Sequence, residues 1–135
     1  MIQQYKPWLY AGVVLLLTEG CFSSPFKSRA TTVFGTVTDN DTKLPLENNK
    51  LAIWGNEGTL AFKGKILKTV FTDKEGKYSV TIDVPKDYHS LNVDNISDAI
   101  KYRDYFSYKD NNRVNFCCPV EIGTKTQYDF IMLPK

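Results

Sequence analysis

The sequence predicts an all-β protein, a single antiparallel β-sandwich of about seven short strands that follows an N-terminal signal segment. Beyond residue 31, apolar or β-branched residues alternate with polar ones, which is the period-two pattern of strands with one buried face. Short segments rich in Asp, Asn, Gly and Pro separate these runs and favour tight turns. With 135 residues, 42% of them hydrophobic, the chain suits one domain with one packed core.

The strands are expected where the alternation is clearest and a turn signal closes each end. The first of them ends at residues 39–42, Asp-Asn-Asp-Thr, which we interpret as a turn closed by an Asp side chain. The expected strands are residues 31–38, 50–54, 66–72, 77–84, 88–93, 102–108, 113–120 and 127–133.

A β-hairpin is predicted from residues 66–72 and 77–84. The connection, Asp-Lys-Glu-Gly at 73–76, suits a type I turn followed by a left-handed glycine. The second strand has strictly alternating apolar residues at 78, 80, 82 and 84, so it should bury one face.

One short helix is predicted over residues 93–102, with a turn as the alternative. Ile96, Ala99 and Ile100 fall at helical spacing, and Asn95 or Ser97 would cap the helix. A tight turn is also expected at residues 110–112, between two of the strands.

Residues 1–20 read as a signal peptide. Lys6 precedes an apolar run from Trp8 to Leu17. Ten helical residues span about 15 Å, half of a bilayer's hydrocarbon core, so the run is too short to cross it comfortably. A run of this length suits the hydrophobic part of a secretory signal.

Cys21 follows this segment directly, with the small residue Gly20 before it. This arrangement resembles a bacterial lipobox, which implies cleavage before Cys21 and acyl chains on that cysteine as a membrane anchor. An ordinary signal peptide and an uncleaved anchor are the alternatives. The predicted organisation is a signal peptide (1–20), a tether (21–31) and a β-sandwich domain (32–135).

Three segments of the first half match, one each and in this order, the motifs G-x-V-x-D, T-x-x-P-L and T-D-x-x-G-x-Y. They are Gly35 to Asp39, Thr42 with Pro45-Leu46, and Thr72-Asp73 with Gly76 and Tyr78. The pattern resembles the carboxypeptidase regulatory-like, transthyretin-like β-sandwich over residues 34–85, and residues 127–133 resemble that family's last strand. The resemblance implies a fold in which the Gly, Asp and Pro positions shape turns, and it implies no activity.

Together with Cys21, this resemblance points to small lipoproteins of Bacteroidota. It implies a bacterial outer membrane location, lipid-anchored. Surface-export signals of that group resemble acidic runs just after the cysteine, and residues 22–25, Phe-Ser-Ser-Pro, contain none. The periplasmic face is therefore favoured over the cell surface.

Composition argues against two classes of function. The chain has 17 basic and 15 acidic residues, a net charge of +2, which is too weak for a nucleic-acid binder. The chain has one His and three Cys, and a zinc site of three or four such ligands would need nearly all of them. We therefore expect no metal, no cofactor and no nucleic-acid partner.

The chain is also predicted not to be an enzyme. His89 is the single histidine and lies in a polar connection after Pro85, whereas a catalytic triad needs an oriented, buried imidazole. Transthyretin-like enzymes that hydrolyse hydroxyisourate resemble this chain in fold, but they use several histidines and a C-terminal Tyr-Arg-Gly-Ser motif. A small hydrolase that uses His89 remains a remote alternative.

Four aromatic residues are candidates for ligand binding. Tyr102, Tyr105 and Tyr108 are interleaved with basic residues, and Trp54 precedes a glycine-containing loop. Aromatic rings beside basic groups stack sugar rings or grip a peptide, and burial in the core is the alternative role for the same rings.

Cys117 and Cys118 are adjacent, and in a strand one would be buried and the other exposed. Three arrangements are open: a vicinal disulfide, an intermolecular bridge and two reduced thiols. A C-x-x-C redox motif is not present.

These observations predict a non-catalytic, lipid-anchored envelope protein. Its domain would bind or scaffold another envelope protein or a glycan, and a purely structural accessory subunit of an outer-membrane complex is the alternative. A binding module should expose its aromatic cluster in a groove, whereas a structural subunit should bury these rings and offer a sheet edge.

Overall fold

The computed structural model describes residues 28–58 and 64–135, and within them it is all-β. The predicted fold class is confirmed, with nine strands rather than about seven. The strands are β1 (Ala30–Asp39), β2 (Lys50–Asn56), β3 (Gly64–Phe71), β4 (Lys77–Asp83), β5 (Ser90–Asn95), β6 (Tyr102–Lys109), β7 (Asn112–Val114), β8 (Pro119–Val120) and β9 (Lys125–Pro134). The signal segment and Cys21 lie outside the described residues.

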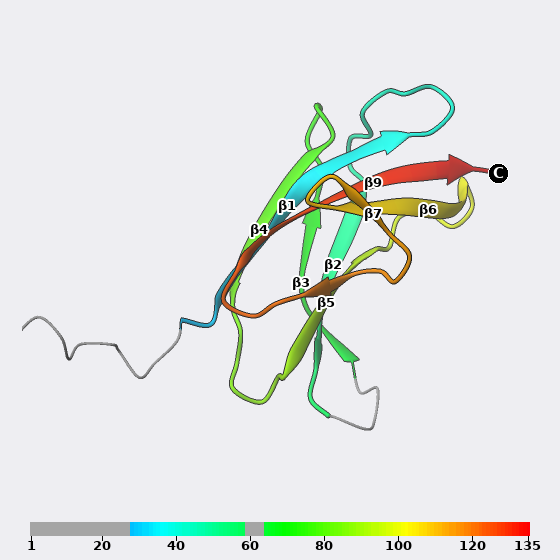
Figure 1. Ribbon diagram of the computed structural model, residues 1–135. Coiled ribbons are helices and arrows are strands. Elements are labelled where there is room, and N and C mark those ends of the chain that lie inside the picture. Colours follow the sequence, from blue (N-terminus) through cyan, green and yellow to red (C-terminus); the bar gives the residue numbers. More distant parts are fainter. Residues whose placement is uncertain (1–27, 59–63) are drawn as a thin grey trace, which may run out of the picture.

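The strands form two sheets that pack as a sandwich (Figure 1). One sheet has the order β4-β1-β9-β6-β7, and the other has the order β3-β2-β5-β8. Alternate residues of the central strands point between the sheets and form the core. Its largest fully buried side chains are Tyr128, Phe130, Val33 and Val37 from the first sheet and Leu51, Ile53, Leu91 and Val93 from the second.

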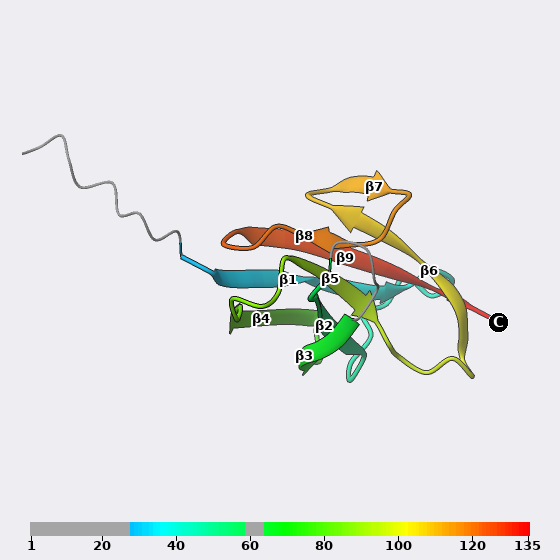
Figure 2. The same cartoon turned by 90° about the horizontal axis from the view of Figure 1, so that it is seen from below.

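The pairing of β1 with β9 is parallel, although the sequence predicts an antiparallel sandwich. The remaining strand pairs are antiparallel. Because β1 and β9 run in the same direction, the start of β1 and the end of β9 lie at opposite ends of the molecule (Figures 1 and 2).

The β1–β9 ladder is interrupted at Gly35 and Thr36. Backbone pairing stops at Phe34 and resumes at Val37, and in between the Thr36 N–H donates to Asp129 Oδ1 at 2.8 Å. A Cβ atom on Gly35 would lie 1.8 Å from the backbone oxygen of Tyr128. Gly35 is therefore required for a close approach within the sheet, not for a turn as the resemblance implies.

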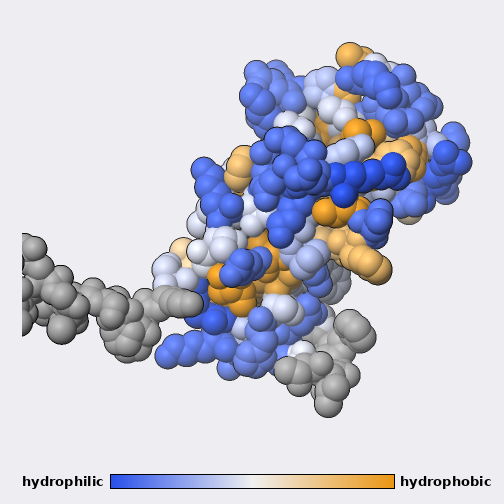
Figure 3. All heavy atoms as spheres, viewed as in Figure 1, coloured by the Kyte–Doolittle hydropathy of each residue, from blue (hydrophilic) through white to orange (hydrophobic). Residues whose placement is uncertain are grey.

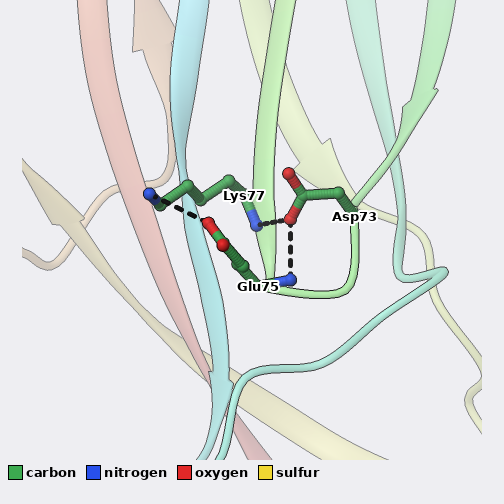
Figure 4. Close-up of polar contacts among 3 residues, drawn as sticks. All are labelled: Asp73, Glu75 and Lys77. Atoms are coloured by element: carbon green, nitrogen blue, oxygen red, sulfur yellow. Dashed lines mark hydrogen bonds and ion pairs between the residues drawn. The ribbon is translucent and has the colours of Figure 1, made fainter.

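The turn at residues 73–76 forms as predicted. Asp73 Oδ1 accepts the N–H groups of Glu75 and Lys77 at 2.9 Å each, and Gly76 has φ +71° (Figure 4). The Gly76 N–H also donates to the Asp73 carbonyl at 2.9 Å. The turn that the local sequence predicts is therefore present.

The predicted hairpin, however, is wrong. β3 pairs with β2 in one sheet, and β4 pairs with β1 in the other, so the turn joins the edges of two sheets. Tyr78, Val80 and Val84 are buried as predicted, whereas Ile66 and Phe71 of the preceding strand are 41% and 56% exposed. A strand with so little buried surface is suited to the edge of a sheet, and here it pairs with the free backbone N–H and C=O groups of β2.

The predicted helix over 93–102 is also wrong. β5 continues to Asn95, and residues 99–101 form a turn. The Asn95 carboxamide oxygen accepts the Ser97 N–H at 3.1 Å, and Asp98 Oδ1 accepts the Ile100 N–H at 2.9 Å. These side-chain bonds replace the backbone bonds that a helix would need.

The strand predicted over 113–120 is split between the sheets. β7 pairs with β6 in the first sheet, and β8 pairs with β5 in the second. The two-residue β6–β7 loop forms the expected tight turn, since Asp110 and Asn111 have φ of 49° and 68°, as a type I′ hairpin requires.

The three segments that carry the family resemblance meet at one end of the sandwich. Thr72 is 2% exposed, its hydroxyl donates to the Leu46 carbonyl and it accepts the Asn49 N–H at 2.9 Å. Val37 donates to the Gly76 carbonyl at 2.8 Å and accepts from the Leu46 N–H at 2.9 Å. These residues therefore have structural roles.

The surface seen in Figure 3 is mostly hydrophilic, with hydrophobic residues in separate groups. The large exposed hydrophobic residues of the described chain are Ile66 and Phe71 on β3 and, outside the strands, Leu44, Ile100 and Phe116. Among the described residues no helix has the length and apolarity needed to cross a membrane.

Candidate ligand-binding site

A pocket of about 470 Å³ lies over the outer face of the β2–β5 pair and opens to solvent. Trp54 on β2 and Asn92 on β5 are directly opposite each other in the antiparallel ladder. Residues two positions further along each strand, Asn56 and Asp94, project from the same face. We call it the Trp54 pocket, and its lining residues are Trp54, Asn56, Gly64, Asn92, Val93, Asp94, Tyr105 and Cys117.

Tyr105 reaches this pocket from β6 of the other sheet. Its ring packs edge-on against Phe130 with centroids 5.3 Å apart, and its hydroxyl donates to Asp94 Oδ1 at 2.8 Å. Burial, and then the bond to Asp94, raise the pKa of Tyr105, so the phenol stays protonated at neutral pH. The bond links the two sheets at the pocket wall.

Trp54 is half-buried, so one part of the indole rests on the sheet and another faces the pocket. Asn56 next to it donates from Nδ2 to the Ser90 hydroxyl at 3.1 Å. The pocket therefore combines two aromatic rings with two carboxamides and a carboxylate, which are groups that accept and donate hydrogen bonds around a stacked ring.

The other two aromatic candidates lie elsewhere. An irregularity between Tyr102 and Asp104 turns both Tyr102 and Tyr105 toward the core, but Tyr102 lines a different pocket near Asp98 and Lys101. Tyr108 pairs with Asp129 on β9. The structure thus brings together Trp54 and Tyr105 and leaves Tyr102 and Tyr108 apart from them.

The predicted basic partners of these rings are also outside the Trp54 pocket. The guanidinium of Arg113 lies 4.0 Å from the centre of the Phe106 ring, and Lys109 lines another pocket near His89. In the described part of the chain, no basic side chain lines the pocket to attract an acidic ligand.

Cys117 and Cys118 lie in the connection between β7 and β8, not in a strand. Cys118 is 1% exposed and Cys117 is exposed, and the structure pairs the two sulfur atoms as a vicinal disulfide. The Cys118 carbonyl accepts the Val93 N–H at 3.0 Å, and Cys117 Sγ lies 3.8 Å from the Tyr105 hydroxyl. Cys117 therefore forms part of the pocket wall.

His89 is exposed and lies with Ser90 and Glu121 around an open depression of about 800 Å³. The Ser90 hydroxyl accepts from Asn56, and the His89 backbone N–H donates to the Asn56 carbonyl at 3.0 Å. Within the described residues no hydrogen bond joins the imidazole to the serine, which nucleophile activation requires.

Among residues 28–58 and 64–135, no three His, Cys, Asp or Glu side chains gather closely enough to hold a metal ion. The pocket residues Asn56, Asn92 and Asp94 were not candidates in the sequence. Their one signal is the alternation of polar residues on two strands, which any solvated sheet face also has.

No family model and no curated protein matches the chain. Two solved structures are similar in part. A 9R-lipoxygenase from Cyanothece PCC8801 aligns at 18% identity and a TM-score of 0.44, over 75% of this chain and 16% of the lipoxygenase. The shaft pilin SpaA from Lactobacillus rhamnosus GG aligns at 9% identity and a TM-score of 0.46, over 82% of this chain and 52% of the pilin. The chain thus spans at most about half the length of either.

Proposed function

We propose that this protein is a non-catalytic, lipid-anchored component of the bacterial envelope whose β-sandwich binds a glycan in the Trp54 pocket. The observation that supports this function is the meeting of Trp54 and Tyr105, from two different sheets, around one open pocket. A half-exposed indole offers an apolar face to a sugar ring, and Asn56, Asn92 and Asp94 beside it bond to hydroxyl groups.

Glycan binding is tested by fluorescence titration, because the chain has only two tryptophans, Trp8 and Trp54. In the full chain carrying Trp8→Phe, Trp54 becomes the sole indole reporter. Neutral cello-, malto- and chito-oligosaccharides are the probes. We expect at least one of these series to shift the Trp54 emission with a saturable dependence on concentration.

A pair of variants distinguishes binding at a specific site from non-specific binding. Trp54→Ala, followed by calorimetry, should weaken binding about tenfold or more, since loss of a central aromatic anchor costs roughly 2 kcal/mol. Phe71→Ala removes an exposed aromatic ring of the same sheet outside the pocket and should leave affinity unchanged. Equal losses in both variants, or none in Trp54→Ala, would contradict the proposed site.

The lipid anchor is the second part of the proposal and rests on the resemblance of Gly20-Cys21 to a lipobox. Intact mass and detergent partitioning of the protein from its native membrane test this directly. We expect the mass of residues 21–135 plus acyl chains, which Cys21→Ala should abolish. A soluble product of Cys21-containing protein, or a retained signal segment, would contradict it.

A protein partner is the second candidate, which includes the structural accessory role. β3 is an edge strand with one unpaired side, and it exposes Ile66 and Phe71. An edge of this kind pairs with an extended segment of another chain. Chemical crosslinking in intact cells through Thr69→Cys would identify such a partner, and the absence of any crosslinked product would argue against it.

A further inference from the structure

Asp94 is the one charged side chain among the described residues that line the Trp54 pocket. Two cationic side chains of neighbouring strands are engaged elsewhere. The Lys50 ammonium lies 5.9 Å from the centre of the Phe71 ring, and Lys68 donates to the Thr81 carbonyl at 3.1 Å. Among the described residues, no cation lines the pocket to balance this negative charge.

The Asp94 carboxylate is held in position and stays accessible. Tyr105 donates to Oδ1 and fixes the side chain, while Asp94 is only partly buried and lines the open pocket. A carboxylate accepts about four hydrogen bonds, so most of its capacity remains after the bond from Tyr105. Asp94 is thus able to accept from a ligand stacked near Trp54.

Tyr105 adds no charge of its own to this site. Burial against Phe130 raises the pKa of its phenol, and the proton stays on the hydroxyl that points at Asp94. The phenol of Tyr105 therefore adds no negative charge to the one that Asp94 carries.

Building on the proposed glycan-binding function, we propose that Asp94 is the specificity-determining residue of the Trp54 pocket. It favours basic amino sugars over neutral sugars, and it disfavours sugars that carry carboxylate or sulfate groups. An ammonium group makes a charge-assisted bond to Asp94, about twice as strong as a neutral one. An anionic sugar meets a like charge in a partly desolvated site.

Three matched probes test this selectivity by Trp54 fluorescence in the full Trp8→Phe chain at low salt. They are β-1,4-linked trimers of glucosamine, of N-acetylglucosamine and of glucuronate. We expect the glucosamine trimer to bind at least about tenfold more tightly than the glucuronate trimer, with the neutral trimer between them. High salt should narrow this difference because it screens the charges.

Asp94→Asn keeps the shape of the side chain and its bond from Tyr105 but removes the charge. It should bring the glucosamine and glucuronate affinities within about threefold of each other and change the affinity for the neutral trimer by less. Asp83→Asn neutralises an exposed strand aspartate of the other sheet and should preserve the discrimination.

The possible results separate this proposal from the function on which it rests. Equal binding of the charged trimers by the parent chain, or discrimination that survives Asp94→Asn, would overturn the role of Asp94 and leave glycan binding intact. Binding of none of the trimers would overturn the role of Asp94, and failure of the cello- and malto-oligosaccharides as well would overturn glycan binding too.

Discussion

Gly35 occupies a place where no side chain fits. The backbone oxygen of Tyr128 lies where its Cβ would be, and that oxygen also accepts the hydroxyl of Tyr78 at 2.6 Å. Next to it, Asp129 accepts both the N–H and the hydroxyl of Thr36, at 2.8 and 3.0 Å. A gap in the β1–β9 ladder is thus closed by side chains, and glycine is the residue that permits it.

We therefore expect Gly35→Ala to lower the free energy of unfolding by about 3 kcal/mol, because the added methyl group meets backbone that cannot move cheaply. Urea denaturation followed by far-UV circular dichroism measures the change. Gly64→Ala is the control, since its Cβ would meet Asn56 and Trp54 side chains no closer than 3.3 Å. A loss in Gly35→Ala no larger than in this control would contradict the explanation.

Asp39 should make the stability of the fold depend on pH in the acid range. Its Oδ1 accepts the N–H groups of Thr42 and Asp41 at 3.0 and 2.8 Å, and the Thr42 bond is the largest cause of its lowered pKa. A carboxyl with a lowered folded pKa stabilises the protein above its unfolded value, near 3.8. That contribution is lost as the pH falls through the folded pKa.

Asp39→Asn retains an acceptor for the turn but cannot titrate. Its stability should therefore fall less steeply than that of the parent chain as the pH is lowered from about 5 to about 2. Urea titrations at several pH values measure the two slopes. Asp41→Asn, which changes an exposed neighbour, should follow the parent chain, and identical slopes for all three proteins would refute the role of Asp39.

At the level of elements, the turn at 73–76 has the chemistry of a hairpin but joins two sheets. Its bonds are local and follow from the sequence: an Asp that accepts two N–H groups and a Gly with positive φ. Which strand pairs with which is decided by non-local contacts, since β3 finds β2 and β4 finds β1. No local pattern distinguishes these two outcomes.

Asp73→Ala should lower the free energy of unfolding by about 1 kcal/mol, because two N–H groups lose their acceptor and must bond to water. Glu75→Ala is the matched control from the same turn (Figure 4). It removes an ion pair with Lys77 whose side chains are 72% and 63% exposed, and should cost less than about 0.5 kcal/mol. Equal effects would indicate that the turn depends on the ion pair.

The sequence correctly predicts the structural features that depend on residues close to one another in the chain. Alternation correctly places Tyr78 and Val80 in the core, and turn residues correctly mark the chain reversals. It fails where side-chain bonds compete with the backbone, as at Asn95, which ends a strand instead of capping a helix. It also fails where the chain changes sheets between β7 and β8.

For the candidate site, too, the sequence predicts some features and misses others. Trp54 and Tyr105 are conspicuous as aromatic residues, but their meeting depends on the packing of one sheet over the other. In the sequence, Asn92 and Asp94 cannot be told apart from the polar residues of any solvent-facing strand. Only the register of β2 and β5 shows that they lie beside Trp54. The site is therefore a property of the assembled sandwich.

At the scale of the whole molecule, the parallel β1–β9 pair has a mechanical consequence. A protein held at residue 28 and pulled at Lys135 has its load applied along β1 in one direction and along β9 in the other. Such a load shears the ladder, so its bonds share the force and break together, whereas an antiparallel pair would open one bond at a time. Pulling between these residues should need more force than pulling between residue 28 and the β6–β7 loop, as single-molecule stretching would measure. If the protein is tethered through its N-terminal side, its architecture is that of a domain able to bear tension.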